Sequence, residues 1–216
     1  MNNGWVDYCV PQLYWQIGHS AADYKTLIEW WNRYASVRPL YIGEDVERTA
    51  KFADLDNPNS NQMPAKFALH SQLPNVNGTV LWYAKAAVDN VGNYGTMLRN
   101  KYWRYPALHP RMPFIDSKAP KKPKKVKPVW TCDGYILFWT KPNAKHWDDE
   151  VHKFVVYRFE KGEKINLDDP TKIVTITDKE YYKLPYVDGK KRCTYVVTSL
   201  DRMSNESKAV KKKLKL

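Results

Sequence analysis

The sequence predicts two domains, an α/β domain followed by an all-β domain, and three features of its 216 residues support this. Over residues 1–117, apolar runs alternate with helical patterns, as is typical of parallel sheets covered by helices. A lysine- and proline-rich stretch follows at residues 118–127. Short alternating runs then fill residues 128–216. A chain of this length accommodates two small domains.

The first apolar run, residues 5–15, is predicted to be a strand buried on both faces. A bulge or a local end of pairing is expected at Pro11, because proline has no N–H to donate. Ser20 is predicted to cap an amphipathic helix over residues 21–36, which Pro39 ends.

Two further strand–helix repeats follow this helix. Residues 40–43 and 79–84 are predicted to be buried strands, with helices near 65–72 and 93–102. This order implies right-handed crossovers and a parallel sheet. Three strands alone leave sheet edges open, so the segment either belongs to something larger or forms a homo-oligomer through those edges.

The lysine- and proline-rich stretch is predicted to be a linker. Residues 118–127 carry six lysines, and proline together with like-charge repulsion favours an extended, solvated chain. The short alternating runs beyond it are separated by Gly, Asp, Asn and Pro and predict an antiparallel β-sandwich. These runs are residues 135–140, 154–159, 172–177, 191–199 and 208–216.

The net charge of +12 does not by itself predict nucleic-acid binding. Residues 1–117 have a net charge of +1 and residues 118–216 one of +11, and the excess comes from the linker lysines and the five lysines of residues 208–216. A nucleic-acid groove spreads basic residues over a folded face with aromatic residues between them. Nucleic acid is therefore not a predicted partner.

The three cysteines are not arranged for a metal site. The sequence has no CxxC motif and no Cys/His cluster, so neither a metal nor another cofactor is predicted. Cys9 is expected to be a buried apolar residue, and a Cys132–Cys193 disulfide across the sandwich is the less favoured alternative. No run of 18 apolar residues predicts a transmembrane helix, and residues 1–4 do not resemble a signal peptide.

Several segments resemble the C-terminal part of the glycosyl-hydrolase-like 10 family. The most specific is residues 5–31, which contain a Pro-Gln-x-Tyr-Trp strand and a Trp-Trp helix. The others are residues 40–43, 77–84 and 105–113. The resemblance implies strands six to eight of a bacterial (β/α)8 barrel hydrolase, with the missing N-terminal barrel portion as a partner. It also implies a secreted, periplasmic or cell-surface location for the full-length protein.

The all-β part resembles a fibronectin type III module. Residues 135–142 are similar to the second strand of such a module, and residues 195–207 are similar to its last hairpin. Modules of this kind commonly follow bacterial glycan hydrolases. The expected fold class is therefore about three βα units of a (β/α)8 barrel followed by a fibronectin-III-like β-sandwich.

The candidate site residues follow from the barrel resemblance, because barrel chemistry takes place at the carboxyl ends of the strands. The amide of Gln12 can bond sugar hydroxyls, and Tyr14 and Trp15 offer flat faces for stacking on a pyranose ring. The alternative is that one of these aromatics packs under the following helix. His19 either binds substrate or caps the helix, and capping is favoured.

Glu44 and Asp45 follow the second strand. By position only, Glu44 stands where many retaining barrel hydrolases hold their nucleophile, and Asp45 is predicted to bind substrate. The favoured alternative is a pair of exposed loop acids. On the last strand, Trp82 is predicted to bind substrate, unless it or its neighbour Tyr83 belongs to the core.

These features predict the C-terminal part of a glycoside hydrolase that acts on a polysaccharide or a peptidoglycan-type glycan. Glycoside hydrolysis typically needs two carboxyl groups flanking the scissile bond, and the one expected at strand four is missing from this chain. The chain is therefore expected to be inactive alone. The alternative is a non-catalytic surface module that binds a glycan or a protein.

Overall fold

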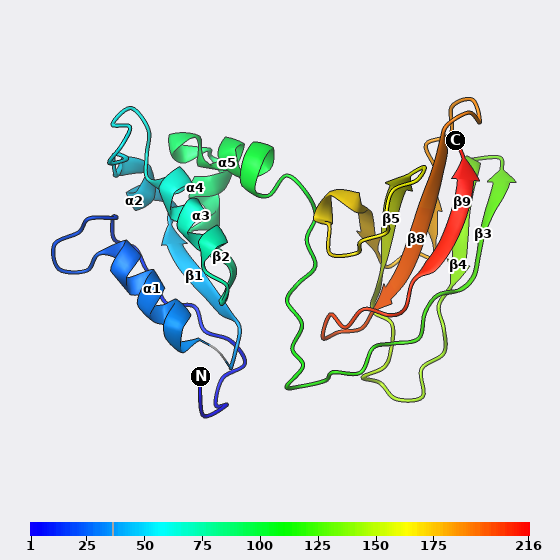
Figure 1. The fold of residues 1–216 in the computed structure, drawn as a ribbon, viewed down its shortest axis with the longest axis horizontal. Coiled ribbons are helices and arrows are strands. Elements are labelled where there is room, and N and C mark those ends of the chain that lie inside the picture. Colours follow the sequence, from blue (N-terminus) through cyan, green and yellow to red (C-terminus); the bar gives the residue numbers. More distant parts are fainter. Residues whose placement is uncertain (36) are drawn as a thin grey trace. The chain divides into compact units, whose positions relative to one another are not determined.

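The computed structural model describes residues 1–35 and 37–216, and the chain divides into two compact units. Unit 1 comprises residues 1–104 and unit 2 comprises residues 105–216 (Figure 1). Each unit has two clusters of buried apolar side chains of its own. In the part of the chain that is described, no helix is long and apolar enough to cross a membrane.

The sheet of unit 1 consists of two parallel strands, β1 (Leu40–Asp45) and β2 (Val76–Trp82). Their register aligns the carboxyl ends, with Glu44 opposite Leu81 and Asp45 opposite Trp82. The even-numbered residues Leu40, Ile42 and Glu44 are fully buried, since alternate side chains of a strand point to the same face.

Residues 5–15 run beside β1 without forming a regular strand. Within this described stretch, the pairing is limited to two isolated parallel bridges, Cys9 with Leu40 and Gln12 with Gly43. Pro11 lies between the bridges and cannot donate a ladder hydrogen bond. The approach is close, because a Cβ atom on Gly43 would lie 3.1 Å from the carbonyl oxygen of Pro11.

Helices cover the buried face of this sheet. α1 begins after Asp23, whose carboxylate accepts from the N–H of Thr26 at 2.9 Å. The prediction that Ser20 caps this helix is therefore wrong, and position 36, its predicted last residue, lies outside the described residues. The helices are α1 (Tyr24–Tyr34), α2 (Val46–Lys51), α3 (Met63–Gln72), α4 (Ala84–Val88) and α5 (Tyr94–Met97), with single turns η1 (Val91–Asn93) and η2 (Leu98–Tyr102).

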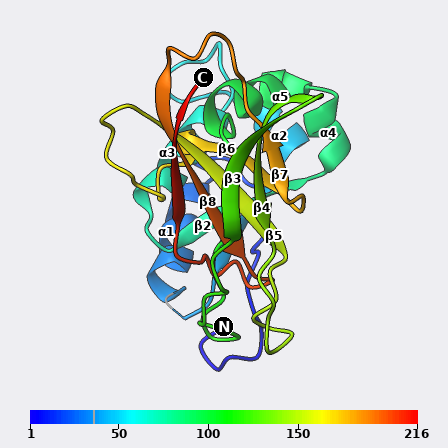
Figure 2. The same cartoon turned by 90° about the vertical axis from the view of Figure 1, so that its right-hand side faces the viewer.

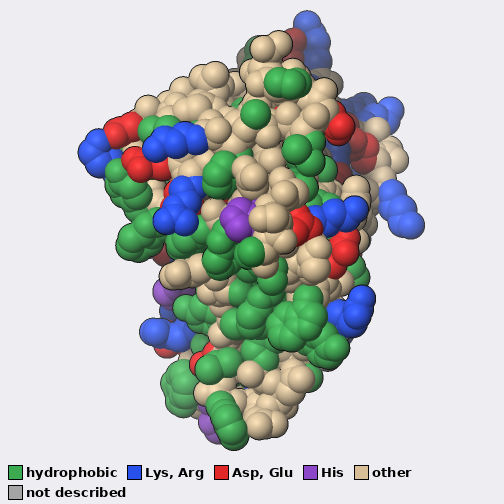
Figure 3. Space-filling model, turned by 90° about the vertical axis from the view of Figure 1, so that its left-hand side faces the viewer, with side chains coloured by type: hydrophobic (Ala, Val, Ile, Leu, Met, Phe, Trp, Pro, Cys, Tyr) green, Lys and Arg blue, Asp and Glu red, His purple; other side chains and the backbone are tan. Residues whose placement is uncertain are grey.

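The packing of α1 leaves aromatic side chains at the surface. Tyr24 and Ile28 are fully buried, whereas Trp30 and Tyr34 are about half exposed and contact each other. Hydrophobic side chains are spread over much of this side of unit 1 (Figure 3). Unit 1 therefore offers exposed aromatic rings away from the strand tips as well as at them.

Unit 2 contains two antiparallel sheets (Figure 2). The three-stranded sheet has the order β3-β4-β7, with β3 (Lys124–Thr131), β4 (Gly134–Thr140) and β7 (Tyr181–Lys183). The four-stranded sheet has the order β6-β5-β8-β9, with β5 (Lys153–Glu160), β6 (Ile173–Thr177), β8 (Arg192–Leu200) and β9 (Val210–Lys215), and a turn η3 (Pro170–Lys172) precedes β6.

Both sheets of unit 2 contribute to one apolar core. Leu137 and Trp139 of β4 pack with Phe154 of β5 and Tyr195 of β8, because alternate residues of each strand face inward. The cysteines are free thiols, including Cys193, which is buried in this core. β3 begins at Lys124, within the stretch predicted to be a linker.

The predicted fold class is wrong. The described residues form a small α/β unit with a two-stranded parallel sheet and a second unit of antiparallel sheets, and no barrel fragment is evident among them. A barrel closes only with eight strands, and here one of the three expected strands is reduced to two bridges around Pro11. The fibronectin-III-like sandwich was part of the same prediction, and it is replaced by the two observed sheets, in which a strand starts within the lysine- and proline-rich stretch.

Candidate functional site

The carboxyl ends of β1 and β2 bring several predicted site residues together. Asp45 and Trp82 are partners in the parallel register, and Gln12 bridges to Gly43 next to them. Two backbone hydrogen bonds hold Gln12 beside β1. The N–H of Leu13 donates to the carbonyl oxygen of Gly43 at 3.0 Å, and the N–H of Gly43 donates to the carbonyl oxygen of Pro11 at 2.9 Å. We call Gln12, Tyr14, Asp45, Trp82 and Tyr83 the strand-tip group.

The strand-tip group is open to solvent at its aromatic members. Trp82 is 59% exposed and Tyr83 40% exposed, and Gln12 is exposed as well. The hydroxyl of Tyr83 donates to Oε1 of Glu47 at 3.0 Å, and this bond is the main cause of the raised pKa of Tyr83. An exposed indole and an anchored phenol beside an amide are suited to a ligand with both apolar C–H and hydroxyl groups.

Asp45 is committed mainly to the start of α2. Its Oδ1 accepts from the N–H of Arg48 at 2.9 Å, and its Oδ2 lies 3.3 Å from Nε of Arg48. Tyr14 is half-buried nearby, and its pKa is raised by burial and then by the Asp45 carboxylate. The structure therefore places Tyr14 and Asp45 within electrostatic reach of each other.

Glu44 points away from the strand-tip group and is fully buried. Its Oε2 lies 2.9 Å from Nζ of Lys66, which is also fully buried, and Nζ in turn donates to Oγ1 of Thr49 at 3.1 Å. Burial lowers the pKa of Lys66, and the Glu44 carboxylate opposes part of that effect. The ion pair ties the end of β1 to α3, because breaking it would leave an uncompensated buried charge.

A hydrogen-bonded chain extends from Glu44 to β2. The hydroxyl of Tyr24 donates to Oε1 of Glu44, and Nε2 of His70 lies 2.7 Å from the same hydroxyl. Nδ1 of His70 lies 2.9 Å from Oγ1 of Thr79. Since the Tyr24 hydroxyl has one proton and gives it to Glu44, Nε2 of His70 must be the donor to Tyr24, which leaves Nδ1 to face the Thr79 hydroxyl.

This buried network was not predicted, although the sequence contains a signal for part of it. Lys66 and His70 are four residues apart on α3 and share a helical face with the buried Met63 and Phe67. A lysine on an apolar face calls for a buried anion. The sequence gives no indication that the anion is Glu44 or that Tyr24 joins it.

The remaining predicted residues have separate surroundings. Trp15 is 38% exposed. His19 holds the turn before α1, because its Nδ1 accepts from the N–H groups of Ala21 and Ala22 at 3.2 and 3.1 Å. A hollow of about 690 Å³ in unit 1 has none of the predicted site residues among its described lining, which comes from residues 50–53, 58–61, 92, 93, 96 and 97. Among residues 1–35 and 37–216, no group of three His, Cys, Asp or Glu side chains is placed to hold a metal ion.

Comparison with known proteins finds relatives that are named glycosyl hydrolases. Over 217 aligned residues it is 32% identical to glycosyl hydrolase YngK of Bacillus subtilis, and the alignment covers the whole chain and 42% of YngK. The whole chain is therefore similar to part of a glycosyl hydrolase. It is also 30% identical over 91 residues to glycosyl hydrolase DigH of Escherichia coli, covering 38% of the chain and 20% of DigH. No protein-family model matches the chain, and it spans less than half the length of these relatives.

Proposed function

We propose that this chain is the C-terminal part of a glycoside hydrolase of the glycosyl-hydrolase-like 10 group. In this proposal its strand-tip group holds a polysaccharide or a peptidoglycan-type glycan. The observation that carries the proposal is the exposed Trp82 in register with Asp45, beside the exposed amide of Gln12. Aromatic faces pack on the C–H groups of a sugar, and amides and phenols bond its hydroxyls.

Catalysis by the isolated chain is not part of this proposal. Hydrolysis typically uses two carboxyl groups on either side of the scissile bond. Glu44 is fully buried against Lys66, and Asp45 is occupied by the start of α2 and by Arg48. We therefore assign Glu44 a positioning role, and the catalytic pair would come from the rest of a longer protein in a secreted, periplasmic or cell-surface location.

The binding half of the proposal is tested with the purified chain and a matched pair of tryptophan variants. Trp82→Ala removes the exposed indole of the strand-tip group, and Trp30→Ala removes a similarly exposed indole from α1. Binding to insoluble peptidoglycan and to a neutral soluble polysaccharide is measured by co-sedimentation and calorimetry. We expect Trp82→Ala to weaken binding about tenfold, as for loss of one stacking partner, and Trp30→Ala to leave it unchanged.

The catalytic half is tested by measuring reducing-end release with the same substrates. No release by the purified chain is expected. Clear turnover by the chain alone would contradict the assignment of Glu44 to positioning. Equal binding by the wild type and the Trp82→Ala variant would instead exclude the strand tips as the sugar site, and it would favour the alternative of a surface module that binds elsewhere.

A further inference from the structure

The two lysine-rich tracts of the sequence lie on neighbouring strands of unit 2. The strands β3 and β9 contact each other, and Val126 and Leu214 from these strands pack in the same core (Figures 1 and 2). Seven lysines are therefore gathered along two adjacent strands. They are Lys124, Lys125 and Lys127 of β3 and Lys211, Lys212, Lys213 and Lys215 of β9.

A hollow of about 470 Å³ lies beside β9, and its charged lining is entirely cationic among the described residues. Lys161, Arg192, Lys213 and Lys215 supply this charge, and Arg192 is the cross-strand partner of Lys215. Within the described chain, no carboxylate lies within ion-pair distance of any of these four side chains.

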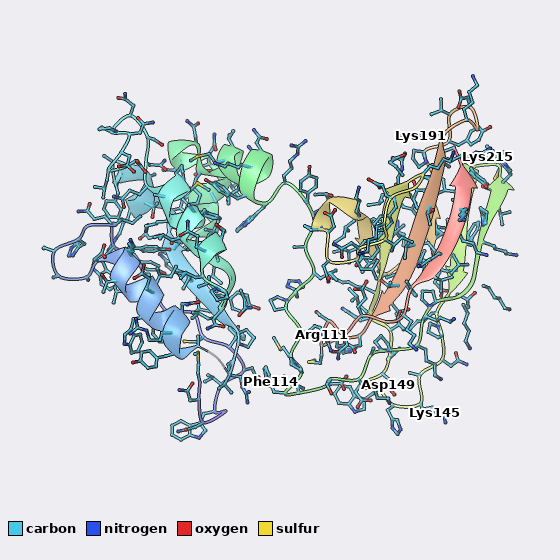
Figure 4. All side chains as sticks on the ribbon, in the orientation of Figure 1. Arg111, Phe114, Lys145, Asp149, Lys191 and Lys215 are labelled. Carbon is cyan, nitrogen blue, oxygen red and sulfur yellow. The ribbon has the colours of Figure 1, made fainter. Side chains whose placement is uncertain are left out.

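The nearest acid along these strands already has cationic partners. Glu160 stands opposite Cys193 in the pairing of β5 with β8. Its carboxylate lies 3.1 Å from Arg158 and 3.5 Å from Lys191. Figure 4 shows Lys191 at the same end of the sheet as Lys215. Among the described residues, this end of the sheet therefore has more cationic than anionic side chains.

Protection of sheet edges explains only part of this pattern. Lysines on an edge strand discourage pairing with other chains, which accounts for those of β9. Arg192, however, belongs to β8, which is paired on both sides, and Lys161 lies in a loop. Cations held together without a counter-charge attract an anionic ligand.

We call the lysines of β3 and β9, together with Lys161 and Arg192, the basic face of unit 2. We infer that this basic face binds an anionic polysaccharide, one that carries carboxylate or phosphodiester groups. The inference deepens the proposed function and rests on it for the choice of a glycan. Nucleic acid fits less well, because the described lining of the hollow has no aromatic ring on which a base could stack. A membrane surface fits less well because the only large apolar side chain in that lining is Leu214.

The test uses the full chain and alginate, a soluble polyuronate, with binding measured by calorimetry at low and physiological salt. In the test variant, Lys211, Lys213 and Lys215 are changed to glutamine. In the control variant, Lys145, Lys153 and Lys179 of the same unit are changed to glutamine, which alters the net charge equally. We expect the test variant to bind about tenfold or more weakly and the control to stay within about twofold of the wild type.

Changing the same three β9 lysines to arginine should preserve binding, and it keeps the test valid if the glutamine variant folds poorly. Equal losses in test and control variants would overturn the inference, because attraction would then follow net charge alone. Equal or tighter binding to duplex DNA or to anionic vesicles would overturn the choice of a glycan. Trp82→Ala with a neutral polysaccharide tests the proposed function separately, so each hypothesis fails on a different variant and ligand.

Discussion

The two units of this protein differ in whether their charged side chains are buried and paired or exposed and unpaired. Unit 1 has a net charge of +1, and it buries Glu44 of β1 against Lys66 of α3. Hydroxyl groups of α1 and α2 hydrogen-bond to this pair. Unit 2 has a net charge of +11, and its β9 lysines have no carboxylate within ion-pair distance among the described residues. A buried pair is suited to fixing the position of a strand end, whereas exposed and unpaired cations are suited to meeting a partner.

The largest effect is expected from breaking the buried pair of unit 1. Lys66→Met leaves Glu44 buried without a counter-charge, and it should lower the free energy of unfolding by about 3–5 kcal/mol. Urea unfolding followed by circular dichroism measures the change. Lys85→Met is the control, because Lys85 pairs with Asp89 in the open, and it should leave stability unchanged.

A double variant separates the ion pair from simple packing. Glu44→Leu combined with Lys66→Met removes both charges, and it should recover much of the stability lost in Lys66→Met. If the single variant is as stable as the wild type, the Glu44 carboxylate is not held as a charged group in the folded state. The contrast between the two units would then lose its basis.

The corresponding substitution in unit 2 acts on an apolar core. Leu137 is fully buried on β4 between the two sheets, and Leu137→Ala should lower the free energy of unfolding by about 2–5 kcal/mol. The same urea experiment measures this, and Val187→Ala, at a largely exposed position of this unit, is the control. A small effect at Leu137 would mean that the sheets do not depend on a shared core.

Individual elements of unit 1 were predicted more accurately than their arrangement. α1, α3, β1 and β2 were placed to within a few residues, because apolar periodicity is a local property of the sequence. The contact of Lys66 with Glu44 spans 22 positions, and no local pattern encodes it. Pro11 was expected to disturb pairing, but its reduction of a whole strand to two bridges depends on contacts with β1.

In unit 2 the amino-acid composition of residues 118–127 did not indicate the strand that begins there. Lysine and proline in residues 118–127 are typical of a solvated linker, yet β3 begins at Lys124 and pairs with β4. The buried Val126 supplies the apolar contact that holds it. The basic face depends on β3 lying next to β9, and that adjacency comes from topology alone.

Alkaline titration should distinguish the two units, because burial shifts the pKa of a lysine in unit 1 in the opposite direction to the pKa of the buried tyrosines in both units. Burial raises the pKa of Tyr24 in unit 1 and of Tyr157 and Tyr195 in unit 2 above the ordinary value of 10.0. Above that pH the unfolded chain releases protons that the folded chain keeps, so stability falls as pH rises. The lowered pKa of Lys66 acts oppositely between its folded value and 10.5, because there the unfolded state holds more protons.

Unit 2 should therefore lose stability as the pH rises above about 10. In unit 1 the loss caused by Tyr24 should be partly offset up to pH 10.5 by the opposite effect of Lys66. Tyrosinate absorbance and circular dichroism are followed together in the wild type and in Lys66→Met. Ionisation of all tyrosines near 10 while the fold persists would show that these side chains are not buried.

The smallest effect on stability is expected at the strand tips, where unit 1 resembles unit 2 in offering exposed groups to a partner. Tyr83→Phe removes the hydroxyl that donates to Glu47. Because this bond is at the surface, the unfolding midpoint should not change, whereas binding of a neutral polysaccharide should weaken by about threefold through loss of one hydrogen-bonding group. Glu47→Gln keeps an acceptor for that hydroxyl and is the matched control. Destabilisation by Tyr83→Phe without any change in binding would make the strand-tip group a structural feature, and unit 2 would then hold the better candidate for the glycan surface.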